Sequence, residues 1–285
     1  MKPTIAIIAA GAMGSAVARR LAEHGVTVLT SLTGRSAGSR ARAEACGMRH
    51  AEDAEIVERS KIILSIVPPA DALAVAERFA GPLKGKGGAV FADCNAISVP
   101  TAAKIAGLVE GTGESFVDGA IIGLPPKGDD PGPTFYFAGD NAGVLTELSA
   151  YGLRVRTMDG PVGAAKALKL SYAGITKGLV AIGTSMILAA ERAGAGQALY
   201  EELAISQTQL LERFSRTLPG MYPKAYRWVE EMHAISDFIG AQYPEARIFD
   251  GAAGLYERMA SDVSGSNAEH QVIDAFLRRK AVPAR

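Results

Sequence analysis

TIAIIAAGAMGSAVARRL, residues 4–21, joins an apolar run to a helix-forming run through a turn that contains glycines. The apolar, β-branched start is typical of a buried strand, and the Ala/Arg-rich end is typical of a helix. A strand, a tight turn and a helix start with spaced glycines form the fingerprint of dinucleotide-binding domains. The three glycine positions hold Ala9, Gly11 and Gly14 here, so the first position departs from the fingerprint.

The turn predicts a pyrophosphate site. Gly11, in the middle position, lets the backbone approach a phosphate closely, and Gly14 permits close packing of the helix on the strand. The helix N-terminus adds N–H groups and the positive end of a dipole. We therefore expect Gly11, Ala12, Met13 and Gly14 to bind a nicotinamide dinucleotide. A tight turn that binds no ligand is the alternative.

Short apolar runs alternate with helix-forming runs through the first half of the chain. This alternation predicts βαβ units and therefore a Rossmann-type, doubly wound, mainly parallel sheet with helices on both faces. Ala/Arg/Glu-rich stretches such as 16–25 and 70–80 supply the helices. The expected strands are residues 4–11, 26–32, 61–69, 88–95, 115–123, 134–139 and 153–160.

The pattern changes near Gly160. Beyond it the sequence shows long amphipathic runs and no convincing strand, which predicts an all-helical second domain. We place an NAD(P)-binding Rossmann domain at residues 1–160 and a helical domain for substrate binding and dimerisation at 161–285. The expected helical runs are residues 161–193, 199–218, 223–240 and 267–279.

Composition argues against several functions. Lys+Arg and Asp+Glu both total 30 in 285 residues, so no net field attracts nucleic acid or an acidic membrane. The longest apolar stretch, 178–190, is shorter than the roughly 20 residues that a bilayer needs. Cys46 and Cys94 fit the reduced thiols of a cytoplasmic protein, and Cys94 is expected to fill space instead of acting as a nucleophile. The 4 histidines show no metal-ligand spacing, so we expect no metal site.

The end of the second expected strand indicates which cofactor binds. An NAD site usually has an acid there, about 20 residues past the glycines, for the ribose 2′-hydroxyl. SLTGRSAGSR, residues 31–40, contains no acid. Arg35, Ser36 and Arg40 offer donors suited to a 2′-phosphate. NADP is therefore the expected cofactor, with NAD, or arginines that are simply solvated, as the alternatives.

Four stretches carry a resemblance to a known family: GAMG (11–14), SIVPP (65–69), DCNAISVP (93–100) and GAAKALK (163–169). Together they resemble the β-hydroxyacid dehydrogenase superfamily, which includes 6-phosphogluconate and 3-hydroxyisobutyrate dehydrogenases. ALKLSYAGITKG (167–178) and AYRWVEEM (225–232) are similar to a branch with a phosphogluconate-dehydrogenase-like C-terminal domain. The resemblance implies an NAD(P)-dependent oxidoreductase that transfers a hydride between nicotinamide and a small hydroxy or carbonyl compound.

The resemblance implies that Lys169 is the general acid/base, because relatives carry the catalytic lysine six residues after a glycine. Periodicity alone does not choose among the lysines of this helix, since Lys166 and Lys177 lie about 20° apart on a neighbouring stripe. Burial would lower the pKa of a lysine from about 10.4 toward a useful range. We therefore expect Lys169→Ala to abolish most turnover, with Lys166→Ala and Lys177→Ala as harmless controls. An interfacial lysine that caps a helix or snorkels at the domain boundary is the alternative.

Further site residues follow from the same resemblance. Relatives place the loop with Val67 and Pro68 beside the nicotinamide. Asn95 lies in the segment that relatives place at the substrate; it is expected to act in catalysis and cofactor binding, or to cap the helix that begins near Val99. Tyr172 is expected as a catalytic residue that replaces a missing hydrogen bond. Gly123 is expected to bind the substrate. Independently of the resemblance, Tyr222, Arg227 and Trp228 form an aromatic-basic cluster that is expected to contact the substrate or the 2′-phosphate side, with ordinary packing and solvation as the alternative.

The sequence departs from the family pattern at four places. Ala173 stands where relatives carry an Asn after the lysine, and Thr176 stands where the phosphogluconate branch has an acid. The Ser-Gly-Gly loop that donates hydrogen bonds to a substrate carboxylate is replaced by Ile122-Gly123-Leu124, and the Lys-Asp pair of the C-terminal helix by Glu231-Met232. Their loss argues against oxidative decarboxylation and favours a larger, more apolar or less anionic substrate. Two alternatives stay open: an imine reductase-like enzyme, and a nucleotide-binding sensor without turnover.

GLVAIGTSMILAAERAGA, residues 178–195, extends the Lys169 helix with small and apolar residues around much of its circumference. A helix that is apolar nearly all round must be buried. We therefore expect a homodimer packed through the helical domains. Burial within a single helical domain is the alternative.

Overall fold

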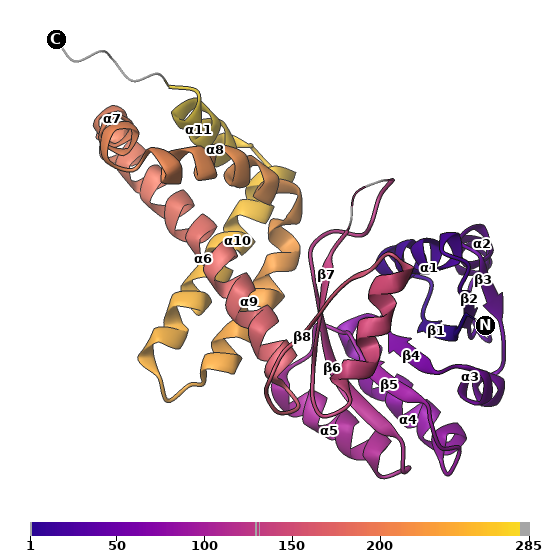
Figure 1. Ribbon diagram of the computed structural model, residues 1–285. Coiled ribbons are helices and arrows are strands. Elements are labelled where there is room, and N and C mark those ends of the chain that lie inside the picture. Colours follow the sequence, from indigo (N-terminus) through magenta and orange to yellow (C-terminus); the bar gives the residue numbers. More distant parts are fainter. Residues whose placement is uncertain (1, 129, 131, 280–285) are drawn as a thin grey trace. The chain divides into compact units, whose positions relative to one another are not determined.

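The computed structural model describes residues 2–128, 130 and 132–279, and it divides into two compact units, Met1–Lys169 and Leu170–Arg285. The first unit is built around a sheet and the second around helices (Figure 1). The expected fold class, a Rossmann-type, mainly parallel sheet followed by a helical region, is confirmed. The boundary between the units follows Lys169, whereas the sequence suggested a boundary after Gly160.

Within the described residues, the sheet has eight strands in the order β3-β2-β1-β4-β5-β6-β7-β8. Neighbouring strands are parallel except for β6 and β7. The order reverses between β1 and β4, and open α/β sheets bind ligands at the carboxyl ends of the strands at such a reversal. The strands are β1 (Thr4–Ile8), β2 (Thr27–Thr30), β3 (Met48–His50), β4 (Ile62–Ser65), β5 (Val90–Asp93), β6 (Ser115–Ile122), β7 (Thr134–Ala138) and β8 (Arg154–Thr157).

Two hydrophobic cores lie on opposite faces of the sheet, because side chains alternate along each strand. Ile5 and Ile7 of β1 belong to one core, and Ala6 and Ile8 belong to the other. The first core is covered by α1 (Ala12–Glu23), α2 (Ala37–Ala45) and the 3₁₀ helix η2 (Ala142–Tyr151). The second is covered by α3 (Asp53–Arg59), α4 (Ala72–Leu83), which follows η1 (Pro69–Asp71), and α5 (Val99–Glu110).

All seven strands expected from the sequence are present, and β3 is the strand that the sequence analysis missed. It is only 3 residues long, and Arg49 and His50 are exposed while Met48 alone is buried. A short strand at the edge of the sheet buries too few side chains to produce a recognisable apolar run.

The second unit packs its helices around one hydrophobic core. Glycines in α6 allow aromatic rings to approach: Gly174 and Gly178 lie against Phe249, and Gly183 lies against Phe214. These contacts explain part of the small-residue content of this long helix. The helices are α6 (Ala164–Arg192), which begins in the first unit, α7 (Gly196–Ser206), α8 (Thr208–Met221), η3 (Tyr222–Lys224), α9 (Ala225–Ile239), η4 (Pro244–Ala246), α10 (Arg247–Ser264) and α11 (Ala268–Leu277).

One helix prediction was wrong in detail, and one helix was missed. The run 199–218 is divided between α7 and α8, which meet at Gln207, and Pro219 lies inside the last turns of α8. The sequence analysis also missed α10, because two glycines, Gly251 and Gly254, weaken its helical signal. Tertiary packing outweighs that weakness, since Leu255, Tyr256 and Met259 of α10 are buried in the core.

Helix α6 has the length and mean hydropathy, 1.5, of a helix that could cross a membrane, and 44% of the apolar window is buried inside the protein. Its charged side chains have protein partners: Lys166 pairs with Asp93, and Lys177 pairs with Glu231. Tyr256 in α10 donates a hydrogen bond to its Lys177 carbonyl over 2.5 Å. These contacts tie Lys166 and Lys177 of α6 to the protein interior.

The packing of Phe214 on α6 predicts how a substitution acts. A Cβ added at Gly183 would lie 2.6 Å from the Phe214 ring, which is buried, so Gly183→Ala should destabilise the protein by about 1–3 kcal/mol. Gly254→Ala is the matched control, because no atom lies within 4 Å of its added Cβ, and it should be neutral or stabilising by up to about 1 kcal/mol. Urea unfolding of the two variants measures both effects; equal loss of stability in both would contradict the packing role.

Candidate active site

Three polar residues lie in one row across the sheet, near the carboxyl edge of the parallel strands. Ser65 pairs with Asp93 across β4 and β5, and Asp93 pairs with Asp118 across β5 and β6. Paired residues in parallel strands point to the same face. All three side chains are fully buried, so each requires polar partners inside the protein.

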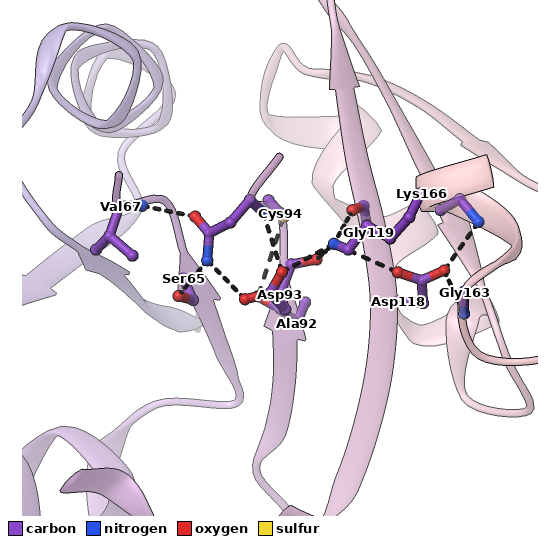
Figure 2. A network of polar contacts seen from close by, with 11 residues as sticks. Ser65, Val67, Ala92, Asp93, Cys94, Asp118, Gly119, Gly163 and Lys166 are labelled. Carbon is purple, nitrogen blue, oxygen red and sulfur yellow. Dashed lines mark hydrogen bonds and ion pairs between the residues drawn. The ribbon is translucent and has the colours of Figure 1, made fainter. Parts of the chain in front are cut away.

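Lys166, in the first turn of α6, supplies the central partner. Its ammonium donates hydrogen bonds to the Asp93 carbonyl oxygen (2.8 Å), Asp93 Oδ1 (2.8 Å) and the Gly119 carbonyl oxygen (2.6 Å). These bonds use all three protons of the ammonium. Asp118 Oδ1 lies 3.3 Å from the same nitrogen as an ion pair. Figure 2 shows Lys166 held between the two carboxylates.

The other oxygen of Asp118 caps the start of α6. Asp118 Oδ2 accepts hydrogen bonds from the backbone N–H groups of Gly163 (2.9 Å; Figure 2) and Ala165 (2.8 Å). A carboxylate is favourable at this position because the first N–H groups of a helix have no intrahelical partner. Gly163 has φ +99, which suits glycine, and its added Cβ would meet the Val99 side chain at 2.6 Å.

Asn95 connects this cluster to the loop after β4. Its Oδ1 accepts a hydrogen bond from the Val67 N–H (2.7 Å), and its Nδ2 donates to Ser65 Oγ (2.9 Å) and Asp93 Oδ2 (2.6 Å). Asn95 is 2% exposed and both of its amide protons are used, so it positions the Val67 backbone. The cap of α5 is the Ser98 side chain, which accepts from Thr101 N–H, so the predicted alternative of Asn95 as a helix cap was wrong.

Lys169 lies one helical turn after Lys166, half-buried. Burial lowers the pKa of Lys169 from its ordinary value to about 8, and the Lys166 ammonium adds to the decrease, while Cys94 and Asp93 oppose it. A lysine with this pKa exchanges protons near neutral pH. Tyr172, a further turn along α6, is 52% exposed.

Cys94 lies in the same region, buried next to Asp93. Burial raises the pKa of its thiol to about 12, which outweighs the lowering effect of Lys166. A thiol with this pKa is protonated at neutral pH and is a poor nucleophile. The structure therefore fits the prediction that Cys94 fills space.

The glycine turn fits a dinucleotide. Gly11 is the N-cap residue of α1, and its added Cβ would meet no atom within 4 Å, so the surface in front of it is open. Gly14 is packed so closely on the Ala9 carbonyl that a side chain has no room. The first N–H groups of α1, those of Ala12 and Met13 included, have no intrahelical acceptor and suit a phosphate.

The loop after β2 and the first turn of α2 contain the residues expected at the 2′-phosphate. The Ser36 side chain caps α2 by accepting from Ser39 N–H, and Arg40 Nε donates to the Arg35 carbonyl oxygen over 3.2 Å. An acid that is distant in the sequence also lies near this loop. Glu52, after β3, accepts a hydrogen bond from the Thr33 hydroxyl (3.2 Å). His50 Nε2 lies 3.3 Å from the same carboxylate.

The residues expected at the substrate belong to both units. Gly123 has φ +131, and its added Cβ would lie 2.9 Å from Pro133. In the helical unit, Tyr222 donates a hydrogen bond to Asp274 (3.0 Å), and Trp228 packs edge-on against Tyr256. These contacts give both aromatic residues a packing role. Arg227 is exposed and lies over the Tyr226 ring, and Pro68 of the Val67 loop is also exposed.

The sequence analysis missed Asp93, Asp118 and Lys166 as a cluster. Lys166→Ala, expected to be a harmless control, would leave two buried carboxylates without their ammonium, so it is unsuitable as a control. The sequence did contain a signal for this cluster. One Asp lies near the end of the expected strand 88–95, another lies in the expected strand 115–123, and a lysine lies in the apolar first turn of the following helix. Carboxylates in buried strands require a buried cation, but spacing does not show which one.

Family models match both parts of the chain. Residues 4–87 match the model described as "NADP oxidoreductase coenzyme F420-dependent", and residues 190–259 match a domain family of unknown function, DUF1932. An uncharacterized 28.5 kDa protein of Methanothermus fervidus is 29% identical over 216 residues, 75% of this chain and 82% of the relative. A solved protein of unknown function, MTH1747, described as structurally similar to 3-hydroxyacid dehydrogenases, is 26% identical with a TM-score of 0.78 over 92% of this chain and 98% of its own.

The resemblance to the β-hydroxyacid dehydrogenases is confirmed. The prediction of an NAD(P)-dependent oxidoreductase is confirmed with it. At the level of fold, 3-hydroxyisobutyrate dehydrogenase of Mycobacterium tuberculosis aligns with a TM-score of 0.72 at 19% identity, over 98% of this chain and all of its own. An imine reductase of Myxococcus stipitatus, solved with NADP+, shares the fold at 18% identity and a TM-score of 0.54, over 97% of this chain and all of its own.

Proposed function

We propose that the protein is an NADP-preferring oxidoreductase that transfers a hydride between nicotinamide and a small hydroxy or carbonyl compound, with Lys169 as the general acid/base. The observation that carries this proposal is the position of Lys169, half-buried on α6 one helical turn after the Lys166–Asp93 ion pair, where burial lowers the pKa of its amine to about 8. A bound nicotinamide cofactor supplies or accepts the hydride. Cytoplasmic location remains part of the same proposal.

Lys169 handles the proton that accompanies the hydride. In reduction, its ammonium donates a proton to the substrate oxygen as the hydride reaches the carbonyl carbon. In oxidation, its neutral amine accepts the hydroxyl proton as the hydride leaves. Reduction therefore requires the protonated form of Lys169 and should weaken as the pH rises through about 8, whereas oxidation should strengthen over the same range.

The departures from the family pattern bear on the substrate. Leu124, in the loop where relatives carry carboxylate donors, is 77% exposed, so an apolar side chain takes the place of polar groups. This favours a larger, more apolar or less anionic substrate. Because imine reductases share the fold, reduction of an imine is the second candidate function. A sensor without turnover is the third, and steady oxidation of NADPH by a carbonyl or an imine would exclude it.

The loop after β2 predicts cofactor preference. The Arg35 and Arg40 guanidinium groups and the Ser36 hydroxyl at the start of α2 should favour a 2′-phosphate, so NADPH should bind at least about tenfold more tightly than NADH, about 1.4 kcal/mol. Fluorescence titration measures both dissociation constants. Arg35→Ala should remove most of the difference, and Glu52→Gln, which removes the acid near the loop, should not. Equal constants in the unsubstituted protein would contradict the preference.

Replacement of the proposed acid/base predicts a specific loss. Lys169→Met should lower turnover by about 10²- to 10⁴-fold in a screen of carbonyl and imine substrates that follows NADPH absorbance. NADPH binding should change little, because the glycine turn contacts the pyrophosphate. Lys104→Met, at an exposed position of α5, is the matched control and should keep full turnover. Full turnover of Lys169→Met on a substrate that the parent reduces would refute the assignment and make Tyr172 the next residue to test.

We also propose a homodimer formed through the helical unit. A groove of about 300 Å³ lies between α6 and α10, and small residues form part of its floor: Gly178, Ala181, Ser185, Gly251 and Ala252. Apolar side chains also line it and remain more than half exposed: Ile182, Met186 and Ile248. The same exposed apolar surface on a second copy could cover these side chains in a two-fold interface, in which both subunits use the same patch.

The dimer has a direct test. Met186→Glu should convert the protein to a monomer, because it puts a charge into the apolar contact. Ile205→Glu is the control, since Ile205 is 80% exposed on α7, away from the groove. Light scattering at micromolar concentration gives the mass of each variant. A monomer mass for the unsubstituted protein would refute the dimer.

A further inference from the structure

Lys166 is a buried ion-pair residue without a role in the function proposed above. It is 1% exposed, and its carboxylate partners Asp93 and Asp118 are fully buried. The desolvation of three buried charged groups opposes their mutual attraction, and apolar side chains of similar volume often stabilise a protein as well. Stability alone therefore gives a weak reason for this cluster.

The cluster is the middle of a continuous chain of polar contacts. The Val67 N–H donates to Asn95, Asn95 donates to Asp93, and Asp93 accepts from Lys166. Lys166 also pairs with Asp118, which in turn binds the first backbone N–H groups of α6. The chain thus connects the loop after β4 with the helix that carries Lys169, through β5 and β6 (Figure 2).

We propose that Lys166 is the positioning residue of the active site. By joining β5, β6 and the start of α6, it fixes the position of Lys169 relative to the Val67 loop. This inference rests on the proposed role of Lys169. A helix turn separates the two lysines, so a shift of Lys166 moves Lys169 with it. The loop that holds the nicotinamide and the group that exchanges the proton are then set by the same ammonium.

Lys166 also acts on Lys169 through its charge. The ionisable groups that act on Lys169 are Lys166 on α6 and Asp93 and Cys94 on and after β5. Lys166 lowers the pKa of Lys169, whereas Asp93 and Cys94 raise it. Asp118 is not among the groups that act on Lys169, so its charge mainly balances that of Lys166. Removal of Lys166 should therefore raise the pKa of Lys169.

The test measures the protonation of Lys169 without a substrate. Acetic anhydride acetylates neutral amines, and peptide mass spectrometry gives the rate at Lys169 as a function of pH. The midpoint in the unsubstituted protein should be near 8. Lys166→Met should raise it by about one pH unit. Lys104→Met should leave it unchanged.

Two further variants keep the test decisive if Lys166→Met does not fold. The double variant Lys166→Met/Asp118→Asn removes one of the two buried carboxylates, while the new amide oxygen can still accept from the α6 backbone. Its midpoint should also rise. Asp118→Asn alone removes a partner of Lys166 but should not move the midpoint. An unchanged midpoint in the Lys166 variants that fold would overturn the inference.

Failure of this inference differs from failure of the proposed function. If Lys169→Met keeps full turnover, Lys169 is not the acid/base, whatever the acetylation midpoints are. If Lys169→Met loses turnover but the Lys166 variants keep the midpoint near 8, the function holds and the positioning role falls. With both confirmed, Lys166→Met should shift the fall of the reduction rate to higher pH.

Discussion

The Lys166 ammonium between Asp93 and Asp118 is the interaction on which the candidate site depends. It brings together two neighbouring strands and the start of α6 in a region closed to water. Removal of one partner would leave an uncompensated buried charge, which usually costs about 3–5 kcal/mol. The same cluster holds Asn95, and through it the loop after β4, in place.

Burial explains why neighbouring groups at this edge differ in chemistry. It lowers the pKa of the Lys169 amine toward neutrality and raises the pKa of the Cys94 thiol away from it. An amine loses a charge on deprotonation and a thiol gains one, so desolvation acts on them in opposite directions. The lysine can exchange protons near neutral pH, and the cysteine remains an inert thiol.

The sequence predicted what depends on local pattern, including the strands, the glycine turn and the helical second half. It missed β3 and α10, because one has a single buried residue and the other contains two glycines. Resemblance singled out Lys169, whereas periodicity did not. The sequence analysis missed the cluster of Asp93, Asp118 and Lys166, because these residues are far apart in the sequence. The pairing of β5 with β6 and the packing of the start of α6 on them bring the three side chains together. The sequence analysis missed Glu52 near the loop after β2 for the same reason.

Amide hydrogen exchange at Val67 tests the central claim most directly, because Lys166 does not touch Val67 and reaches it only through Asp93 and Asn95. If the contacts form one unit, Lys166→Met should accelerate exchange at Val67 by at least about tenfold, about 1.4 kcal/mol. The Gly163 and Ala165 amides, which bind Asp118, should accelerate with it. Unchanged protection of Val67 in a folded Lys166→Met protein would contradict the account.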